Sequence, residues 1–267
     1  MKKSTIFAII IIVVGILVMG LAAYRIWELK QVYVQADSTY DDLSSMVRKN
    51  TETGARASMV NNTGDDGFTV NNLNEAIIHI PTFELDFEML VSINEDAVAW
   101  LYSPDTVIDY PVMRADDYEY YLNHLADGTV NANGSLFIDY NNAHDFSEEL
   151  TVIYGHHMKS GSMFGSIVGY KEQAYFDKHP FMYLYTQNES YRIDLLYGRL
   201  VSASEWIEHG FMHASNIEDL LSFSAAQSTF SSDASYEKGD RIIILSTCSY
   251  EFNDARYFLV GILRAGE

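Results

Sequence analysis

The chain has 267 residues, of which 48% are hydrophobic and 20% charged, a composition that suits a globular protein with a sizeable core. Its 17 Lys and Arg residues stand against 37 Asp and Glu, so the formal net charge is −20 at pH 7. This charge repels phosphate backbones and argues against nucleic acid as a partner. One cysteine cannot form an internal disulfide, so the fold is held by packing.

The N-terminus predicts a membrane anchor. Lys2 and Lys3 precede residues 4–24, which carry no charge and are rich in Ile, Val and Leu. About 20 apolar residues cross a bilayer as a helix, and flanking lysines stay in the cytoplasm. We therefore expect residues 1–25 to form a single-pass anchor in the cell membrane, with the rest of the chain on the extracellular face. A signal peptide cleaved near 20–23 is the alternative.

Residues 26–80 are expected to form a helical stalk and a flexible linker. Within them, residues 38–49 place apolar side chains on one helical face, which predicts a stalk or a helix packed on the domain. Residues 50–76 are rich in Gly, Asn and Asp and show neither a helical nor an alternating period. We expect this stretch to give the anchored domain reach.

Residues 81–267 are expected to form one mostly β domain. Short runs of β-branched and aromatic residues, bounded by Gly, Pro, Asn and Asp, predict strands and favour an all-β barrel or sandwich. Strands are expected at 97–102, 135–138, 150–154, 181–185, 191–197, 241–247 and 257–263, and helices at 86–93, 118–125 and 216–230. The last helix lies in the long connection 202–239, and connections of this length are usually functional or form a lid.

Three places in this domain carry reactive side chains. Cys248 ends a predicted strand, and Arg256 begins the next one, so a hairpin would bring both to one end of the sheet. A nearby guanidinium favours the thiolate and can bind an oxyanion. His156 and His157 follow the strand 150–154, and a Cys–His pair is a recurring activated nucleophile. A buried structural thiol is the alternative reading of the cysteine.

Metal and phosphate sites are not predicted. Neighbouring side chains on a strand point to opposite faces, so His156 and His157 cannot easily share one ion. The sequence has no zinc-ligand spacing, no acidic calcium loop and no glycine-rich phosphate loop. We expect neither a metal nor another cofactor.

The reactive segments resemble those of a known family. Leu245-Ser246-Thr247-Cys248, followed by Arg256, and Tyr154-Gly155-His156 resemble the signature segments of sortases, the cysteine transpeptidases of Gram-positive cell surfaces. The resemblance covers about residues 83–264 and points to class B. The segments similar to class B members are Tyr154–Lys159, Gly161–Phe164, Tyr250–Phe252, Asn253–Arg256, Trp100–Tyr102, Asp109–Val112 and Tyr120–Leu122.

The resemblance implies a closed sortase-type β-barrel with N-terminal helices and one helix in the long connection before the cysteine strand. It also implies roles for three residues. Cys248 would attack the carbonyl of a threonine and form a thioester, His156 would protonate the leaving amine and then assist the incoming one, and Arg256 would stabilise the oxyanion. His157 is expected to point away from Cys248 and to lie on the surface or behind the residues that line the groove.

Other residues match positions that line the substrate groove in class B relatives. These are Tyr154, Ser246 and Leu122. Tyr118, four residues before Leu122, stands where some relatives have Asn, so the contacts at that end of the groove are expected to differ.

The implied function is cleavage of a C-terminal sorting signal after Thr and transfer of the acyl group to an amine of the cell wall. The partners would be surface proteins that bear the signal, and a peptidoglycan cross-bridge amine. Pilin polymerisation, with pilin subunits as substrates and a pilin lysine as the amine, is the alternative. A secreted cysteine peptidase that only hydrolyses and a non-enzymatic binding module stay open as further alternatives. Papain-like peptidases are disfavoured because they place their cysteine before their histidine.

Overall fold

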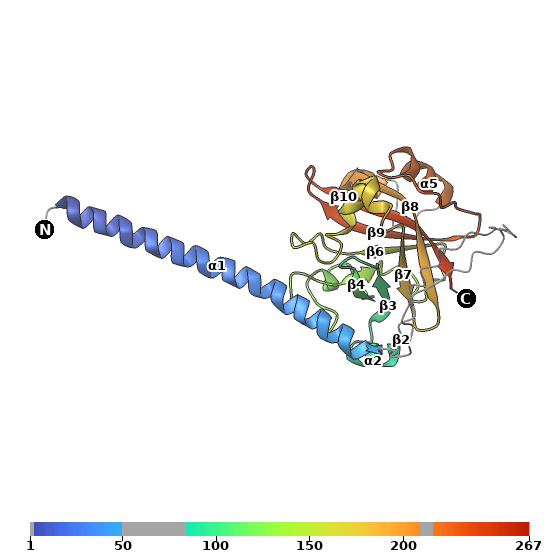
Figure 1. Cartoon of the computed structure of the whole chain (residues 1–267), viewed down its shortest axis with the longest axis horizontal. Coiled ribbons are helices and arrows are strands. Elements are labelled where there is room, and N and C mark those ends of the chain that lie inside the picture. The colour runs from blue at the N-terminus through green and yellow to red at the C-terminus, as the bar shows by residue number, and fades with distance from the viewer. Residues whose placement is uncertain (1–2, 50–83, 209–215, 267) are drawn as a thin grey trace, which may run out of the picture.

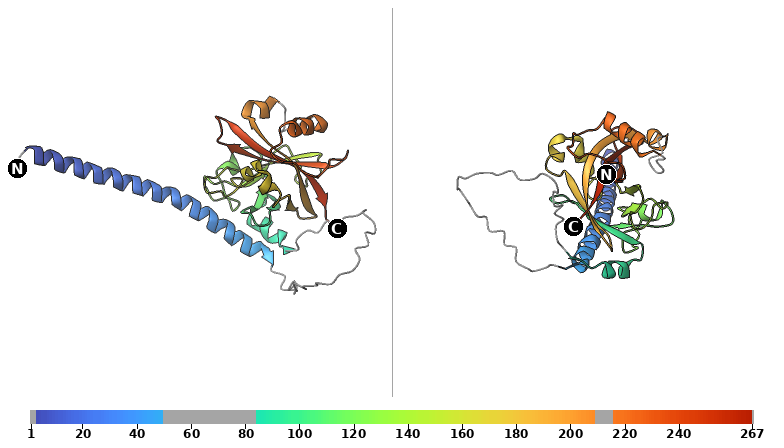
Figure 2. Two further views of the ribbon diagram at one scale, coloured as in Figure 1. Left: turned by 45° about the horizontal axis from the view of Figure 1, so that its top comes forward. Right: turned by 90° about the vertical axis from the view of Figure 1, so that its right-hand side faces the viewer.

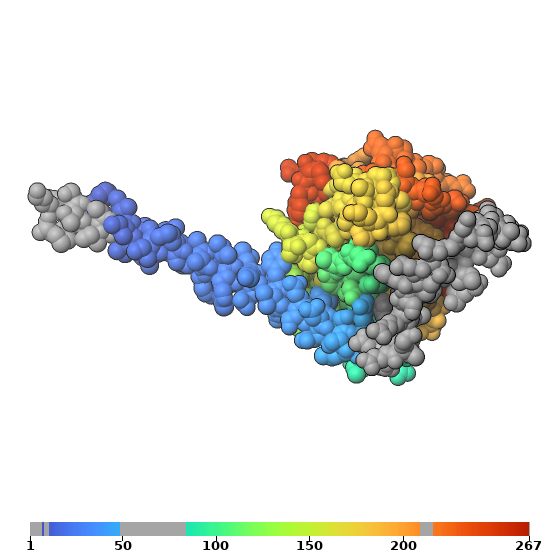
Figure 3. All heavy atoms as spheres, in the orientation of Figure 1, coloured from blue at the N-terminus to red at the C-terminus, as the bar shows by residue number. Residues whose placement is uncertain are grey.

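The N-terminal segment is one long helix. The computed structural model describes residues 3–49, 84–208 and 216–266 of the chain. Helix α1 (Lys3–Val47) is continuous over 45 residues, which corresponds to about 68 Å. It projects from the body as a single rod (Figures 1 and 3). Among the described residues, α1 is the helix that is long and apolar enough to cross a membrane.

The C-terminal part of α1 packs on the domain. Ala36, Tyr40, Leu43 and Val47 are buried, at the three- and four-residue spacing of one helical face. The short helix expected at 38–49 is thus the end of α1. Residues 50–76 lie outside the described residues. Helix α1 itself runs from the apolar segment to the domain.

Eight strands form a closed barrel in the order β10-β8-β7-β3-β4-β5-β6-β9 (Figures 1 and 2). This confirms the mostly β fold and the closed barrel. The strands are β3 (Ala97–Tyr102), β4 (Asp109–Met113), β5 (Leu136–Ile138), β6 (Leu150–Tyr154), β7 (Phe181–Tyr185), β8 (Ser190–Ser202), β9 (Arg241–Ser249) and β10 (Ala255–Ala265). Two short strands, β1 (Arg48–Lys49) and β2 (Glu84–Leu85), pair outside the barrel and follow α1.

Two features of the barrel differ from the expectation. Strand β4 is not predicted by the sequence pattern, because its five residues contain Pro111, which lacks an amide donor. Pro111 precedes the two residues, Val112 and Met113, that pair with β5. Strand β9 continues to Ser249, two residues beyond its expected end, because β10 pairs with it over its whole length.

The turn after β9 lies on the side of the barrel from which α1 projects (Figure 1).

The helices of the domain are short. Asp86 caps α2 (Phe87–Ile93) by accepting from the Met89 amide at 2.9 Å, and Asn216 caps α5 (Ile217–Ala226) by accepting from the amides of Glu218 and Asp219. The predicted helix at 216–230 thus ends at Ala226. The remaining helices are η1 (Tyr120–Leu122), η2 (Ile167–Lys171), α3 (Gln173–Phe176) and α4 (Ala203–Glu208).

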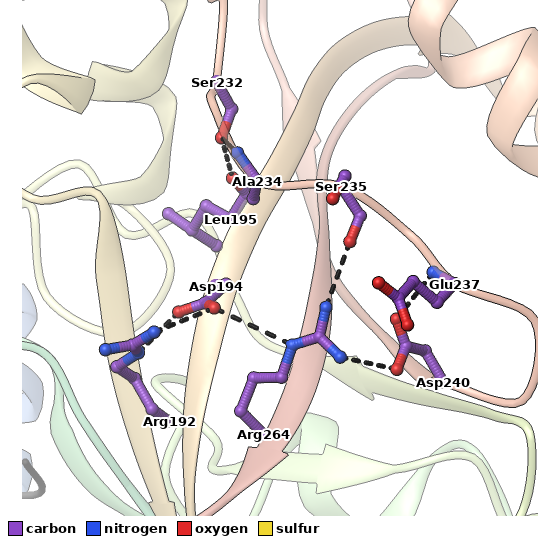
Figure 4. Close-up of polar contacts among 9 residues, drawn as sticks. All are labelled: Arg192, Asp194, Leu195, Ser232, Ala234, Ser235, Glu237, Asp240 and Arg264. Atoms are coloured by element: carbon purple, nitrogen blue, oxygen red, sulfur yellow. Dashed lines mark hydrogen bonds and ion pairs between the residues drawn. The ribbon is translucent and has the colours of Figure 1, made fainter. Parts of the chain in front are cut away.

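Ion pairs gather near the C-terminal end of β10. Arg264 contacts Asp240 at 2.5 Å and Asp194 at 3.9 Å, and it donates to the Ser235 carbonyl at 3.0 Å. Asp194 also pairs with Arg192 at 2.6 Å (Figure 4). These contacts tie β8 and β10 to the connection before β9, at the end of β10 away from Arg256.

Candidate active site

Strand register brings the predicted site residues to one end of the barrel. In the antiparallel pair β9–β10, Cys248 stands opposite Arg256. In the parallel pair β6–β9, Tyr154 stands beside Ser246. Residues directly opposite on antiparallel strands point to the same face with their Cβ atoms about 5 Å apart. The side chains of Cys248 and Arg256 are therefore neighbours, as the hairpin predicts.

These residues line a groove of about 440 Å³. All six of the predicted site residues contribute to it, and Cys248 is exposed. The lining consists of Tyr118, Leu122, Phe137, Tyr154, Gly155, His156, Ala203, Trp206, Ile207, Ser246, Thr247, Cys248 and Arg256. Most of these side chains are aromatic or aliphatic. The groove therefore suits an extended peptide with apolar side chains beside a few polar groups.

A backbone carbonyl holds His156 in one orientation. The Nε2 atom of the ring lies 2.8 Å from the Leu122 carbonyl oxygen. A carbonyl only accepts hydrogen bonds, so we infer that Nε2 carries a proton and donates it. In the neutral ring, Nδ1 is then the atom that is free to take a proton. The contact thus leaves Nδ1 as the ring nitrogen that can accept a proton.

Close packing explains the glycine before His156. A Cβ on Gly155 would lie 2.5 Å from Leu136 Cδ2 and 2.7 Å from Phe164 Cδ2. The sequence suggests that Gly155 allows a sharp turn, but the structure shows that a side chain at this position would have no room. Any larger residue would push β6 and its histidine away from the neighbouring side chains.

His157 lies outside the groove lining, as expected, but it contacts the backbone of Cys248. The sequence predicts that it points away from Cys248, but its Nδ1 atom lies 3.0 Å from the backbone oxygen of Cys248. Its ring also packs against Tyr250, with 4.6 Å between the centroids. Both histidines after β6 therefore contact the region around Cys248. His156 lines the groove, and His157 braces the strand that carries the thiol.

Arg256 is held by an aromatic ring and not by a carboxylate. Its guanidinium carbon lies 5.8 Å from the centre of the Trp206 ring. No carboxylate among the described residues lies within ion-pair distance of it. The positive charge is therefore directed at the groove and at Cys248, where it can bind an oxyanion.

Helix α4 forms part of the groove wall and is not predicted by the sequence pattern. Trp206 is buried against Phe258 and Tyr154, and Ile207 is exposed at the rim. A sequence signal exists, since Trp206 and Ile207 are two large apolar residues within the long connection 202–239. That connection contributes to the site, as its length suggests.

The sequence pattern also does not predict a buried carboxylate beneath the groove. Asp139 is fully buried and accepts hydrogen bonds from the Tyr118 hydroxyl at 2.8 Å and the Tyr154 hydroxyl at 3.3 Å. The backbone amide and the side-chain amide of Asn141 donate to the other oxygen of the Asp139 carboxylate, each at 2.9 Å. Burial, together with the neighbouring carboxylate of Asp139, raises the pKa of Tyr118 and of Tyr154. Both tyrosines therefore stay protonated and present their rings to the groove.

Ser246 adds a polar group to the groove floor. Its side chain is buried, and its hydroxyl has no hydrogen-bond partner among the residues that the structure describes. Buried hydroxyls are normally paired, so this one is suited to a polar group of a bound peptide.

A polar network fixes the turn that follows the cysteine. Lys171 donates to Ser249 Oγ at 2.9 Å and pairs with Glu251, and Ser249 donates to Glu251 as well. Burial alone would raise the pKa of Glu251, but the hydrogen bonds from Lys171 and Ser249 and the charge of Lys171 lower it to about 2. The network ties η2 to the β9–β10 turn.

Comparisons with known proteins agree with this geometry. No protein-family model matches the chain. Sortase B of Listeria monocytogenes is 35% identical over 163 residues, which are 61% of this chain and 66% of that protein, just under two thirds. The crystal structure of Clostridium perfringens sortase B matches 67% of this chain over the whole of its own length, with 28% identity and a TM-score of 0.62.

A solved Bacillus anthracis structure, described as similar to sortase B, is 30% identical over 69% of this chain and 85% of its own, with a TM-score of 0.62. The barrel, the groove and these relatives define a sortase. The chain belongs to the class B sortases, a family of cysteine transpeptidases.

Proposed function

We propose that the protein cleaves a C-terminal sorting signal after Thr and transfers the acyl group to an amine. The observation that carries this proposal is the direct pairing of Cys248 with Arg256, beside His156 in one groove. A nucleophile, an oxyanion donor and a proton carrier are the three groups that acyl transfer needs. The substrate-binding roles of Tyr154, Ser246 and Leu122 belong to the same proposal.

In the first half-reaction, Nδ1 of His156 takes the proton of the Cys248 thiol, and the resulting thiolate attacks the carbonyl carbon of the threonine. A carbon–sulfur bond forms, and the carbonyl oxygen becomes an oxyanion that accepts hydrogen bonds from Arg256. Proton donation from Nδ1 of His156 to the leaving nitrogen accompanies cleavage of the peptide bond. The products are a thioester on Cys248 and a free amine on the released segment.

In the second half-reaction, an acceptor amine attacks the thioester carbonyl. Nδ1 of His156 takes a proton from this amine, a new amide bond forms and the thiolate of Cys248 leaves. Water as the acceptor would give hydrolysis instead. The same three side chains serve both acceptors, so the choice between transpeptidation and hydrolysis depends on which nucleophile occupies the groove.

The proposed acceptor is an amine of the cell wall. Support comes from a structure of sortase B complexed with triglycine, which is 26% identical to this chain, covers 68% of it and 86% of its own, and has a TM-score of 0.61. Pilin polymerisation is the second candidate. It is favoured by Spy0129 of Streptococcus pyogenes, a class B sortase involved in pilus biogenesis, with 26% identity, 67% and 98% coverage and a TM-score of 0.61.

The proposed location is the cell membrane, with the barrel on the extracellular face. The apolar length of α1 supports an anchor within residues 1–25, and Lys2 and Lys3 support a cytoplasmic N-terminus. In this arrangement residues 26–80 connect the anchor to a catalytic domain at 81–267. Substrates retained in the same membrane would then meet the groove on the outer side.

The test is cleavage of fluorogenic peptides of the NPxTN, SPxTG and PPxTG types by the full-length protein, with and without triglycine. We expect one of these peptides to be cleaved after Thr, and mass spectrometry to detect the peptide joined to triglycine. Cys248→Ala is the control and should release no fluorophore. A wild-type protein that cleaves none of the peptides would contradict the proposal, and cleavage with only hydrolysed product would favour a peptidase.

A further inference from the structure

The long N-terminal helix reaches the back of the active site through one tyrosine. Tyr40 on α1 is 5% exposed, and its ring packs edge-on against Tyr110 with 5.1 Å between the centroids. Its hydroxyl donates to the Gly134 carbonyl oxygen at 2.7 Å and lies 3.0 Å from Ser135 Oγ. The hydroxyl therefore holds the two residues that precede β5.

Gly134 in turn touches the groups that hold the histidine. Its φ angle is +58°, a conformation that favours glycine. A Cβ at this position would meet the Tyr121 carbonyl oxygen and would lie 3.0 Å from the Leu122 carbonyl oxygen and 3.1 Å from Cδ2 of His156. The backbone of Gly134 is thus packed against both the imidazole ring and the carbonyl that accepts from its Nε2 atom.

Further hydrogen bonds hold this segment between α1 and η1. The buried side chain of Asn131 donates to the Val32 carbonyl of α1 at 3.0 Å and accepts from the Asn133 amide at 2.9 Å. The Ser135 amide donates to the Tyr121 carbonyl at 2.9 Å. Residues 131–135 therefore form a layer with α1 on one side and the carbonyl that fixes His156 on the other.

We propose that Tyr40 is a positioning residue for the transfer reaction. Its hydroxyl keeps Gly134 against the Leu122 carbonyl and the His156 ring, which keeps the proton on Nε2 and leaves Nδ1 available to the groove. The helix that carries the apolar N-terminal segment is then also a support of the active site. This proposal rests on the proposed function, because it assigns Tyr40 to the step in which His156 moves a proton.

A purely structural tyrosine would behave differently. Loss of its hydroxyl would lower the melting temperature and leave each active molecule as fast as before. Loss of a positioning contact instead slows turnover without weakening peptide binding, because the groove walls at Tyr118, Tyr154 and Trp206 do not touch Tyr40. The ratio of kcat to KM effects and the tautomer of His156 separate the two cases.

The experiment uses the full chain in detergent micelles and compares Tyr40→Phe with Tyr33→Phe. Phenylalanine keeps the ring that packs on Tyr110 and removes only the hydroxyl. Tyr33 lies two turns earlier on α1, is partly buried, and has a hydroxyl without a hydrogen bond to the described residues, so it is the matched control. Thermal unfolding of each variant establishes the folded fraction before kinetics are measured.

For Tyr40→Phe we expect kcat to fall by about 3- to 10-fold, the range that one lost hydrogen bond supports, with KM within about twofold of wild type. In protein labelled with ¹⁵N-histidine, the fraction of His156 protonated on Nε2 should fall. Tyr33→Phe should change neither quantity. Ser135→Ala, which leaves α1 intact, should shift kcat in the same direction by a smaller factor.

An unchanged kcat and an unchanged His156 tautomer in folded Tyr40→Phe would overturn the proposal, whatever the melting temperature. An equal loss of kcat in Tyr33→Phe would overturn it too. The tautomer measurement needs no substrate, so it tests the positioning even if the wild-type protein cleaves no peptide. That latter outcome would count against the proposed function alone.

Discussion

The two arginines of β10 show how differently the ends of one strand are used. Arg264 contacts Asp240, Asp194 and the Ser235 carbonyl, so its charge is neutralised by ion pairs at one end of the barrel. Arg256, eight residues earlier, lies over Trp206 with no carboxylate of the described chain in ion-pair range. Both side chains have the same chemistry, and their surroundings make one structural and leave the other available to a ligand.

The difference matters more because the whole chain is acidic. With 37 acidic residues against 17 basic ones, an arginine on the surface has many carboxylates to pair with. An unneutralised charge opposite the only thiol is therefore evidence for binding an anion, such as the oxyanion of acyl transfer.

The largest effect on activity is expected from Cys248→Ala, at the Arg256 end of β10. This thiol is the proposed nucleophile, so the variant should lose at least about 10³-fold in kcat/KM. Its melting temperature should stay close to wild type, because the side chain is exposed. Cleavage of sorting peptides, followed by fluorescence, measures the loss, and residual turnover within tenfold of wild type would remove Cys248 from this role.

The difference between Arg256 and Arg264 is tested by changing each of them to lysine. Arg256→Lys should lower kcat by about 10²-fold, because an ammonium cannot present two parallel donors to an oxyanion. Arg264→Lys should lower the melting temperature and leave kcat within twofold of wild type. Steady-state kinetics and thermal unfolding of both variants check this. Equal kinetic effects at the two ends would refute the distinction between them.

A smaller effect is expected from Asp139→Asn beneath the groove. The amide offers a weaker acceptor to the hydroxyls of Tyr118 and Tyr154, so the aromatic wall should loosen. We expect KM for the peptide to rise by about 3- to 10-fold, with kcat within twofold of wild type. Asp240→Asn, at the opposite end, is the control. It should affect unfolding only, so a rise in KM for both variants would argue against a local role.

The smallest effect concerns the turn after Cys248. The folded-state pKa of Glu251 is lowered to about 2 from the ordinary value of 4.5, so the ion pair with Lys171 stabilises the fold above pH 4.5. This contribution is lost as pH falls from 4.5 towards 2. Glu251 is partly exposed, so Glu251→Gln should lower the melting temperature by only about 1–3 °C at pH 6.

The pH dependence provides the check on this prediction. The difference in melting temperature between wild type and Glu251→Gln should shrink as the pH is lowered from 4.5 to 2. Thermal unfolding followed by circular dichroism measures it. A difference that stays constant or grows on acidification would show that the carboxylate is not stabilised by its neighbours.

Much of the fold could be predicted from the sequence because its signals are local. Runs of β-branched and aromatic residues marked seven of the eight barrel strands, and Asp86 and Asn216 marked the starts of two helices. Strand β4 was missed since Pro111 breaks the local pattern, and pairing with β3 and β5 supplies what the sequence lacks. The sequence predicts the anchor and a helical stalk, with a separate short helix at 38–49, whereas the structure joins all of these in the single helix α1.

The candidate site divides in the same way. Cys248, Arg256 and His156 stand at strand ends, so topology and resemblance were enough to bring them together. Asp139, Trp206 and Tyr40 contribute through contacts across 15 to 94 residues of sequence, which no local pattern encodes. The contact of His157 with the Cys248 carbonyl likewise depends on the turn after β6 and could not be read from strand alternation.

The most direct test of the central claim is the mass of the full-length protein after incubation with a sorting peptide in the absence of an acceptor amine. We expect a covalent adduct on Cys248 whose mass equals that of the peptide fragment ending in Thr less one water. Hydroxylamine should remove this adduct, as expected for a thioester. An adduct on another residue, or cleavage by a Cys248→Ala protein, would contradict the account.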